Sequence, residues 1–170
     1  MLISQIFHRA SEDAPLVILV HGRSGNVQVM QAFKSCIPSE VNIVSVQAPL
    51  PDPEGGFRWW DFKATLEFSE NSHSNAAAAA KLFEEWLEQF IEEEGLRPSK
   101  LVAVGFSQGA ALLSYVIQIN PGLFSGIAML AGFIVRTSGL GKQSQAKKEK
   151  TRVLVAHGTN DEIVPYSVAS

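Results

Sequence analysis

The chain has 170 residues, of which 46% are hydrophobic and 18% are charged, and its formal net charge is −3. This length supports one sizeable core and is too short for two ordinary domains, so we expect residues 1–170 to form a single domain. A negative net charge gives no basic field for a polyanion, which excludes nucleic acid as an expected partner. The single cysteine, Cys36, excludes an internal disulfide and is expected to be buried. The sequence contains no Cys/His ligand cluster, so we expect no metal and no other cofactor.

The first segment, Leu2–His8, lacks a basic start followed by a long apolar stretch, so it is predicted to be a strand and not a secretion signal. No segment contains about 18 consecutive apolar residues, the length that a membrane-spanning helix needs. We therefore expect no integral membrane segment and a cytoplasmic location.

Strands and helices are predicted to alternate along the rest of the chain. The later strands are predicted at Leu16–Val20, Asn42–Gln47, Lys100–Gly105, Gly126–Leu130 and Arg152–Ala156, and the helices at Val27–Cys36, Asn75–Glu94 and Gln108–Ile119. The inner strands are apolar throughout, which is typical of parallel strands that are buried on both faces. This pattern predicts an α/β fold, a three-layer sandwich with a mostly parallel sheet.

The predicted strand Leu16–Val20 ends in His21-Gly22 and opens a polar loop. A histidine between a strand end and a glycine more often supports the loop through hydrogen bonds than takes part in catalysis, and we favour that role for His21. The loop between Pro49 and Phe62 follows later and contains the large side chains Phe57, Trp59 and Trp60. These aromatic groups are candidates for the wall of a substrate-binding groove, and ordinary core packing explains them equally well.

Two polar segments are predicted to be exposed. Residues 69–75 precede the helix Asn75–Glu94, and we interpret His73 there as a solvated loop histidine without a catalytic role. The segment Arg136–Lys150 contains several basic residues and is predicted to be an exposed connection before the last strand. Solvation explains its charge better than contact with an anionic lipid surface.

The segment Gly105-Phe106-Ser107-Gln108-Gly109 joins a predicted strand to a predicted helix. In a G-x-S-x-G turn of this kind, the glycines permit a sharp bend that exposes the serine hydroxyl, and the helix start offers a free backbone N–H. Ser107 is therefore a candidate acyl-transfer nucleophile, and the backbone amide of Gln108 is a candidate oxyanion donor. The alternative is a tight glycine turn with an exposed serine.

A hydrolase with such a turn needs two further groups. The second oxyanion donor comes from the loop after an earlier strand, which nominates the backbone amide of Arg23. A carboxylate must orient a histidine, and in α/β-hydrolases it follows the serine in the chain. Asp161, after the strand end His157-Gly158, lies at that point, with Glu162 as the weaker candidate. On its own, Asp161 is also explained as a turn-forming residue or a helix cap.

Together these motifs resemble the phospholipase/carboxylesterase family of α/β-hydrolases, which includes bacterial carboxylesterases and acyl-protein thioesterases. The resemblance rests on His21-Gly22, Gln47-Ala48-Pro49, Trp59-Trp60-Asp61-Phe62, Gly105–Gly109 and His157–Pro165, in that order. It implies a serine hydrolase that cleaves carboxylic esters, thioesters or lysophospholipids through an acyl-enzyme on Ser107. Asp161 would be the triad acid, Arg23 and Gln108 would donate to the oxyanion, and the partner would be a small-molecule or acyl ester substrate.

One feature departs from the family pattern. The catalytic histidine should follow the acid, yet none of residues 162–170 is a histidine. We therefore expect the sequence to be C-terminally incomplete, with the last strand and helix of the fold missing, and residues 1–170 alone to be inactive. The alternative is a non-catalytic α/β-hydrolase-fold binding domain. The sequence leaves the acyl-chain preference and the oligomeric state open.

Overall fold

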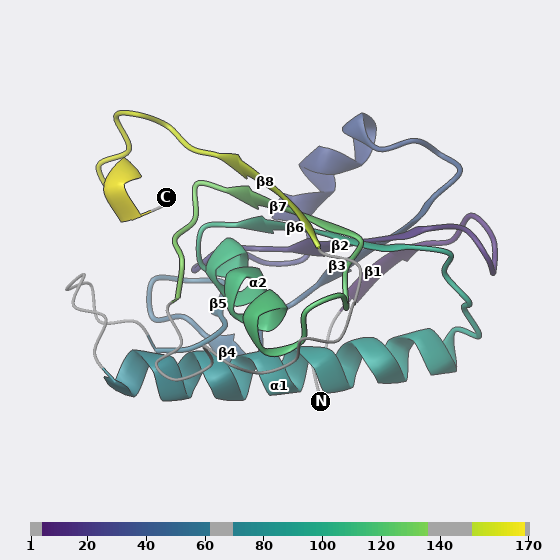
Figure 1. The fold of residues 1–170 in the computed structure, drawn as a ribbon, viewed down its shortest axis with the longest axis horizontal. Coiled ribbons are helices and arrows are strands. Elements are labelled where there is room, and N and C mark those ends of the chain that lie inside the picture. The colour runs from purple at the N-terminus through teal and green to yellow at the C-terminus, as the bar shows by residue number, and fades with distance from the viewer. Residues whose placement is uncertain (1–4, 62–69, 136–150, 169–170) are drawn as a thin grey trace.

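The computed structural model describes residues 5–61, 70–135 and 151–168. They contain a six-stranded sheet in which β1 runs antiparallel to β3 and every other neighbouring pair is parallel (Figure 1). Across the sheet, the strands are β1 (Gln5–His8), β3 (Asn42–Val46), β2 (Leu16–Val20), β6 (Leu101–Phe106), β7 (Gly126–Leu130) and β8 (Arg152–Ala156). The predicted α/β fold with a mostly parallel sheet is confirmed.

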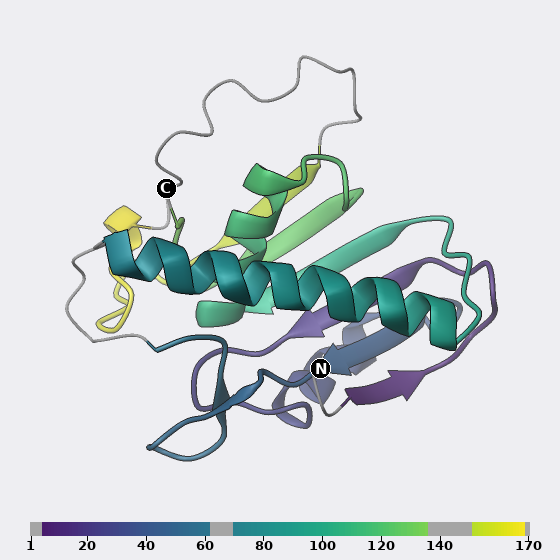
Figure 2. The ribbon, with the colours of Figure 1, turned by 90° about the horizontal axis from the view of Figure 1, so that it is seen from below.

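Two α-helices cover one face of the sheet, and a 3₁₀ helix lies on the other (Figures 1 and 2). They are α1 (Glu70–Glu93), α2 (Gln108–Ile119) and η1 (Val29–Cys36), and the remaining short elements are β4 (Leu50–Pro51), β5 (Phe57–Arg58) and η2 (Tyr166–Val168). The side chains of β2 alternate between the two faces: Ile18 packs in the core with α1 and α2, whereas Leu19 packs with Met30 of η1. Burial on both faces explains why the strand is apolar throughout.

Helix α1 begins at Glu70 and not at Asn75, so the interpretation of residues 70–75 as a loop was wrong and His73 belongs to the helix. The polar residues before Ala76 carry no apolar periodicity, and the pattern therefore could not extend the helix into them. The Cys36 side chain, expected to be buried, is exposed at the last position of η1. The predicted strand start at Leu2 and the connection 136–150 lie outside the described residues.

Strand β8 lies at one edge of the sheet in the part of the chain that the structure describes. Its central side chains are strongly exposed, at 48% for Val153, 61% for Leu154 and 47% for Val155. Its residues Val153–Ala156 are apolar, which is typical of an inner strand, whereas the described part of the chain leaves both of its faces accessible. Among the described helices, none combines the length and the apolar character that crossing a membrane requires.

Candidate active site

Ser107 occupies a sharp turn between β6 and α2, where its backbone has φ 49° and ψ −115°. Few residues other than glycine adopt a positive φ, and such a conformation costs on the order of 1–3 kcal/mol. Two hydrogen bonds hold it: the Ser107 N–H donates to the Leu130 carbonyl at 2.9 Å, and the Ser107 carbonyl accepts from the Ala111 N–H at 3.0 Å. The surrounding backbone thus imposes a strained conformation on the candidate nucleophile.

The two glycines of the turn are required by close backbone contacts. A Cβ atom on Gly105 would lie 2.6 Å from the nitrogen of Ala110, and one on Gly109 would lie 2.3 Å from the carbonyl oxygen of Val20. The helix therefore begins directly against the end of β2. A Cβ on Gly22 would lie 3.0 Å from the Cβ of Ser107, which places the loop after β2 beside the serine.

The two predicted oxyanion donors directly follow the residues of this contact in the chain: Arg23 follows Gly22, and Gln108 follows Ser107. Gln108 is the first residue of α2, and its N–H has no acceptor within the helix. Arg23 follows Gly22 directly, so its backbone N–H belongs to the loop that contacts Ser107. The Arg23 guanidinium is engaged elsewhere, because its Nε donates to Asp52 Oδ2 at 2.8 Å. Only the main chain of Arg23 is therefore available for the predicted role.

Asp52 anchors the loop that carries Arg23. Its buried carboxylate accepts from Arg23 Nε at 2.8 Å, from the Ser24 hydroxyl at 3.2 Å and from the Glu54 N–H at 2.9 Å. The hydrogen bond from Arg23 is the main reason that the pKa of the Asp52 carboxyl is lowered, and the same contact raises the pKa of Arg23. These bonds stabilise the folded protein fully at a pH above the pKa that Asp52 has in the unfolded chain. This stabilisation is lost as the pH falls through the lower pKa that Asp52 has in the folded protein.

The side chain of Gln108 forms a second anchor, which sequence reasoning missed. It is buried, its Oε1 accepts from the Trp59 N–H at 2.9 Å, and its Nε2 donates to the Trp60 carbonyl at 3.0 Å. The Trp59 indole N–H in turn donates to the His21 carbonyl at 2.8 Å. The start of α2, the loop after β2 and the tryptophan loop are thus joined through buried hydrogen bonds.

His21 forms the hydrogen bonds that its position predicted. Its Nε2 accepts from the Ala48 N–H at 3.0 Å, so the ring proton lies on Nδ1, which donates to the Gly22 carbonyl at 2.6 Å. Burial lowers the pKa of His21, which keeps the ring neutral. Both ring nitrogens are occupied by the backbone of neighbouring loops.

The aromatic residues predicted to bind substrate differ in their exposure. Trp59 and Trp60 are 2% and 3% exposed, and the Trp59 ring packs edge-on against Phe83 with centroids 6.0 Å apart. Phe57 is only half-buried. These positions match the packing alternative for the two tryptophans, and the substrate-binding role of the three residues stays a prediction.

Asp161 lies in the loop after β8, whereas Ser107 follows β6. These strands are parallel and separated only by β7, so both residues lie at the carboxyl edge of the sheet. The two strands are about 10 Å apart, which is twice the spacing of neighbouring strands. Asp161 Oδ1 accepts from the N–H groups of Ile163 and Val164 at 2.9 and 2.8 Å. The Val164 bond is the largest cause of the lowered pKa of Asp161, which keeps the carboxylate ionised at neutral pH.

The turn-forming role considered for Asp161 is thus present, but it occupies only Oδ1. The other oxygen, Oδ2, lies 3.5 Å from Nε2 of His157. The side chain of His157 is buried and its Nε2 donates to the Val164 carbonyl at 2.7 Å, so this ring supports the loop. Glu162 is exposed. Within the residues that the structure describes, no group of three or more His, Cys, Asp or Glu residues is arranged to hold a metal ion.

Comparison with known proteins decides the family. The family model described as Phospholipase/Carboxylesterase matches residues 2–170. The chain belongs to this family. Among its family relatives, the chain is 33% identical to the carboxylesterase SOBER1 of Arabidopsis thaliana, over 85% of this chain and 67% of that protein. It is 25% identical to the acyl-protein thioesterase 1 homolog 1 of Dictyostelium discoideum, over 88% of this chain and 70% of that protein.

Solved structures of esterases share the family's fold. The Bacillus cereus carboxylesterase matches with a TM-score of 0.80 at 21% identity, over 96% of this chain and 74% of that one. The esterase PE8 matches with a TM-score of 0.75 at 23% identity, over 97% of this chain and 78% of that one. Membership of the phospholipase/carboxylesterase family, with relatives named as esterases and thioesterases, supports hydrolysis of an ester or a thioester.

Replacement of Gln108 by alanine tests the buried anchor of the elbow. The change leaves a buried N–H of Trp59 and a buried carbonyl of Trp60 without partners, each of which costs about 1–3 kcal/mol. We therefore expect Gln108→Ala to lower the free energy of unfolding by about 2–6 kcal/mol in urea denaturation. The control is Gln89→Ala on the exposed face of α1, which should change it by less than about 0.5 kcal/mol. Equal effects of the two changes would contradict the anchoring role.

Proposed function

We propose that this protein is a serine hydrolase that cleaves carboxylic esters, with thioesters and lysophospholipids within the same chemistry, through an acyl-enzyme on Ser107. The observation that carries the proposal is the strained backbone of Ser107, held at φ 49° at the start of a helix and beside the loop of Gly22. Strain of this kind persists only where the surrounding structure enforces it, and it concentrates at functional sites. Family membership supports the same conclusion.

In the proposed first step, Ser107 Oγ attacks the substrate carbonyl while a base removes the hydroxyl proton. The carbonyl oxygen becomes an oxyanion, and the amides of Arg23 and Gln108 donate hydrogen bonds to it. The intermediate collapses, the C–O or C–S bond breaks, and the alcohol or thiol leaves with the proton. Water then attacks the acyl-serine by the same route and releases the carboxylic acid and the free Ser107.

Asp161 is proposed to orient the histidine that acts as the base. Its ionised state suits this role, because a carboxylate stabilises the imidazolium that forms when the serine proton is transferred. The Oδ1 bonds to the N–H groups of Ile163 and Val164 fix the carboxyl plane, so Oδ2, which accepts no backbone hydrogen bond among the described residues, is the oxygen proposed to accept from the catalytic histidine. No histidine of this sequence is assigned as the base.

The nucleophile is tested by covalent labelling of the protein expressed in its natural reading frame. An alkyl fluorophosphonate should modify Ser107 and no other serine, as located by peptide mass spectrometry. Ser107→Ala should abolish both labelling and hydrolysis of p-nitrophenyl butyrate. The matched control is Ser99→Ala, an exposed serine before β6, which should leave both unchanged. Turnover retained by Ser107→Ala would contradict the assignment, and no turnover in any form would favour a non-catalytic binding domain.

The acid is tested by Asp161→Asn in the same natural chain. Asparagine keeps an Oδ1 acceptor for Ile163 and Val164, so the turn and the fold should be preserved in thermal unfolding. Turnover should fall by about 10⁴-fold, the size of the loss when a triad aspartate becomes asparagine in a serine protease.

Glu162→Gln removes the neighbouring exposed carboxylate and serves as the control. It should change turnover by less than about threefold, because an exposed side chain away from the reacting atoms contributes little. A larger loss in Glu162→Gln than in Asp161→Asn would transfer the acid role to Glu162.

A further inference from the structure

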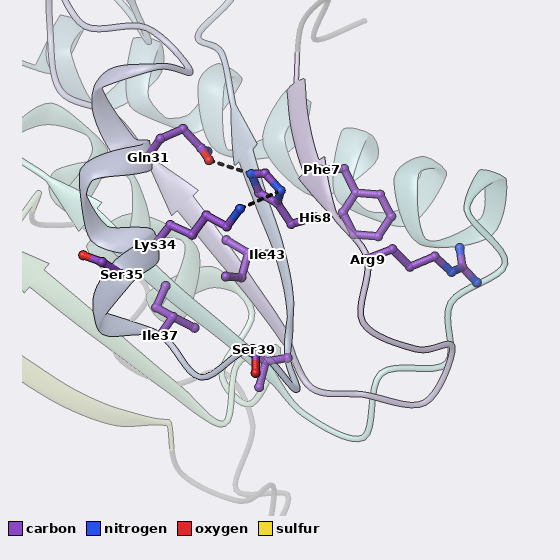
Figure 3. A pocket seen from close by; sticks show the side chains of 10 residues that line it. Phe7, His8, Arg9, Gln31, Lys34, Ser35, Ile37, Ser39 and Ile43 are labelled. Atoms are coloured by element: carbon purple, nitrogen blue, oxygen red, sulfur yellow. Dashed lines mark hydrogen bonds between the residues drawn. The ribbon is translucent and has the colours of Figure 1, made fainter.

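A second candidate site lies at the opposite edge of the sheet from Ser107. An open pocket of about 850 Å³ is formed by the end of β1, by η1 and by the segment that leads into β3 (Figure 3). Its lining includes Val41 and Ile43, at the amino end of β3, whereas Ser107 follows the carboxyl end of β6. The proposed esterase chemistry uses no residue of this pocket.

Three polar side chains meet in this pocket in a fixed order. His8 lies between Gln31 and Lys34 of η1, and dashed lines in Figure 3 mark both contacts. The Lys34 ammonium has only donors, so His8 Nδ1, 3.1 Å away, must accept. The ring proton therefore lies on Nε2, which donates to Gln31 Oε1 at 2.7 Å. Gln31 Nε2 then donates to the hydroxyl of the buried Ser45 at 2.6 Å.

The hydrogen bond to His8 places the Lys34 ammonium at the pocket. One of the three donors of Lys34 is used by His8, and two remain for a ligand. None of the salt bridges among the described residues involves Lys34, whereas the other cation of the lining, Arg9, is paired with Glu94 at 3.7 Å. In Figure 3 the Arg9 side chain extends away from His8 and Lys34. The lining contains no Asp or Glu.

Aliphatic side chains form another part of the pocket lining. Ile43 is 3% exposed, Ile37 and Val41 are half-buried, and the three belong both to the pocket lining and to the small core cluster under η1. Ser35 and Ser39 also belong to the lining. An ammonium beside aliphatic side chains is complementary to an anionic head group attached to a hydrocarbon chain.

We propose that this pocket binds an aliphatic carboxylate. The carboxylate accepts two hydrogen bonds from the Lys34 ammonium, and the hydrocarbon chain packs on Ile37, Val41 and Ile43. The ammonium contacts His8, which Gln31 and Ser45 hold in turn, and this contact reduces the conformational entropy that is lost when the ligand binds. This site is independent of the proposed esterase activity.

The experiment is a titration of the ¹⁵N-labelled protein with sodium octanoate, followed by amide chemical shifts. Saturable shifts should map to residues 7–9 and 31–43, and they should be the same in the Ser107→Ala variant. Octanamide, which has the same chain without the charge, should bind at least about tenfold more weakly, as the loss of one charge-assisted contact predicts. Inorganic phosphate, which has charge without a chain, should also bind at least about tenfold more weakly.

Variants of the exposed Lys34 separate charge from fold. Lys34→Ala should weaken octanoate binding by about tenfold or more, and Lys34→Arg should restore most of it. The matched control is Lys81→Ala on the exposed face of α1, which should leave binding unchanged. Shifts confined to the residues around Ser107, equal binding by Lys34→Ala, equal binding of phosphate or octanamide, or no saturable binding would each overturn the proposal.

Discussion

The close approach of α2 to the end of β2 is the constraint on which the candidate site depends. Helix α2 begins so near this strand that only glycine fits at Gly109, where an added Cβ would lie 2.3 Å from the Val20 carbonyl oxygen. The short path from β6 into the helix then forces the positive φ of Ser107. Because β2 and β6 are parallel neighbours, the loop of Gly22 and Arg23 emerges beside the serine. The candidate nucleophile and the two predicted oxyanion donors are thus brought together by the pairing of two strands.

Buried hydrogen bonds keep the loops at this edge from relaxing. The Gln108 side chain holds the backbone of Trp59 and Trp60, and the Asp52 carboxylate holds Arg23 and Ser24. A buried polar group that loses its partner is costly, so each loop is fixed by the need to satisfy the others. Such a framework presents backbone N–H groups in a defined direction, which the proposed stabilisation of an oxyanion requires.

The sequence predicted those features that local pattern determines. Apolar strands, the glycine-flanked turn at Ser107 and the hydrogen-bonding role of His21 follow from neighbouring residues. The structure alone revealed the partners of Asp52 and Gln108, because Arg23 and Trp59 lie 29 and 49 residues away in the chain. The start of α1 was placed too late because its first residues are polar. The roles of Ser107, Asp161, Arg23 and Gln108 in catalysis remain predictions.

The central claim is that Ser107 reacts where the amides of Arg23 and Gln108 converge. The most direct measurement is a crystal structure of the natural protein after reaction with an alkyl fluorophosphonate, since the phosphonyl oxygen occupies the place of the oxyanion. We expect a bond from Ser107 Oγ to phosphorus, with the phosphonyl oxygen about 2.7–3.1 Å from both backbone nitrogens. An adduct on another residue, or a phosphonyl oxygen directed away from both amides, would contradict the account.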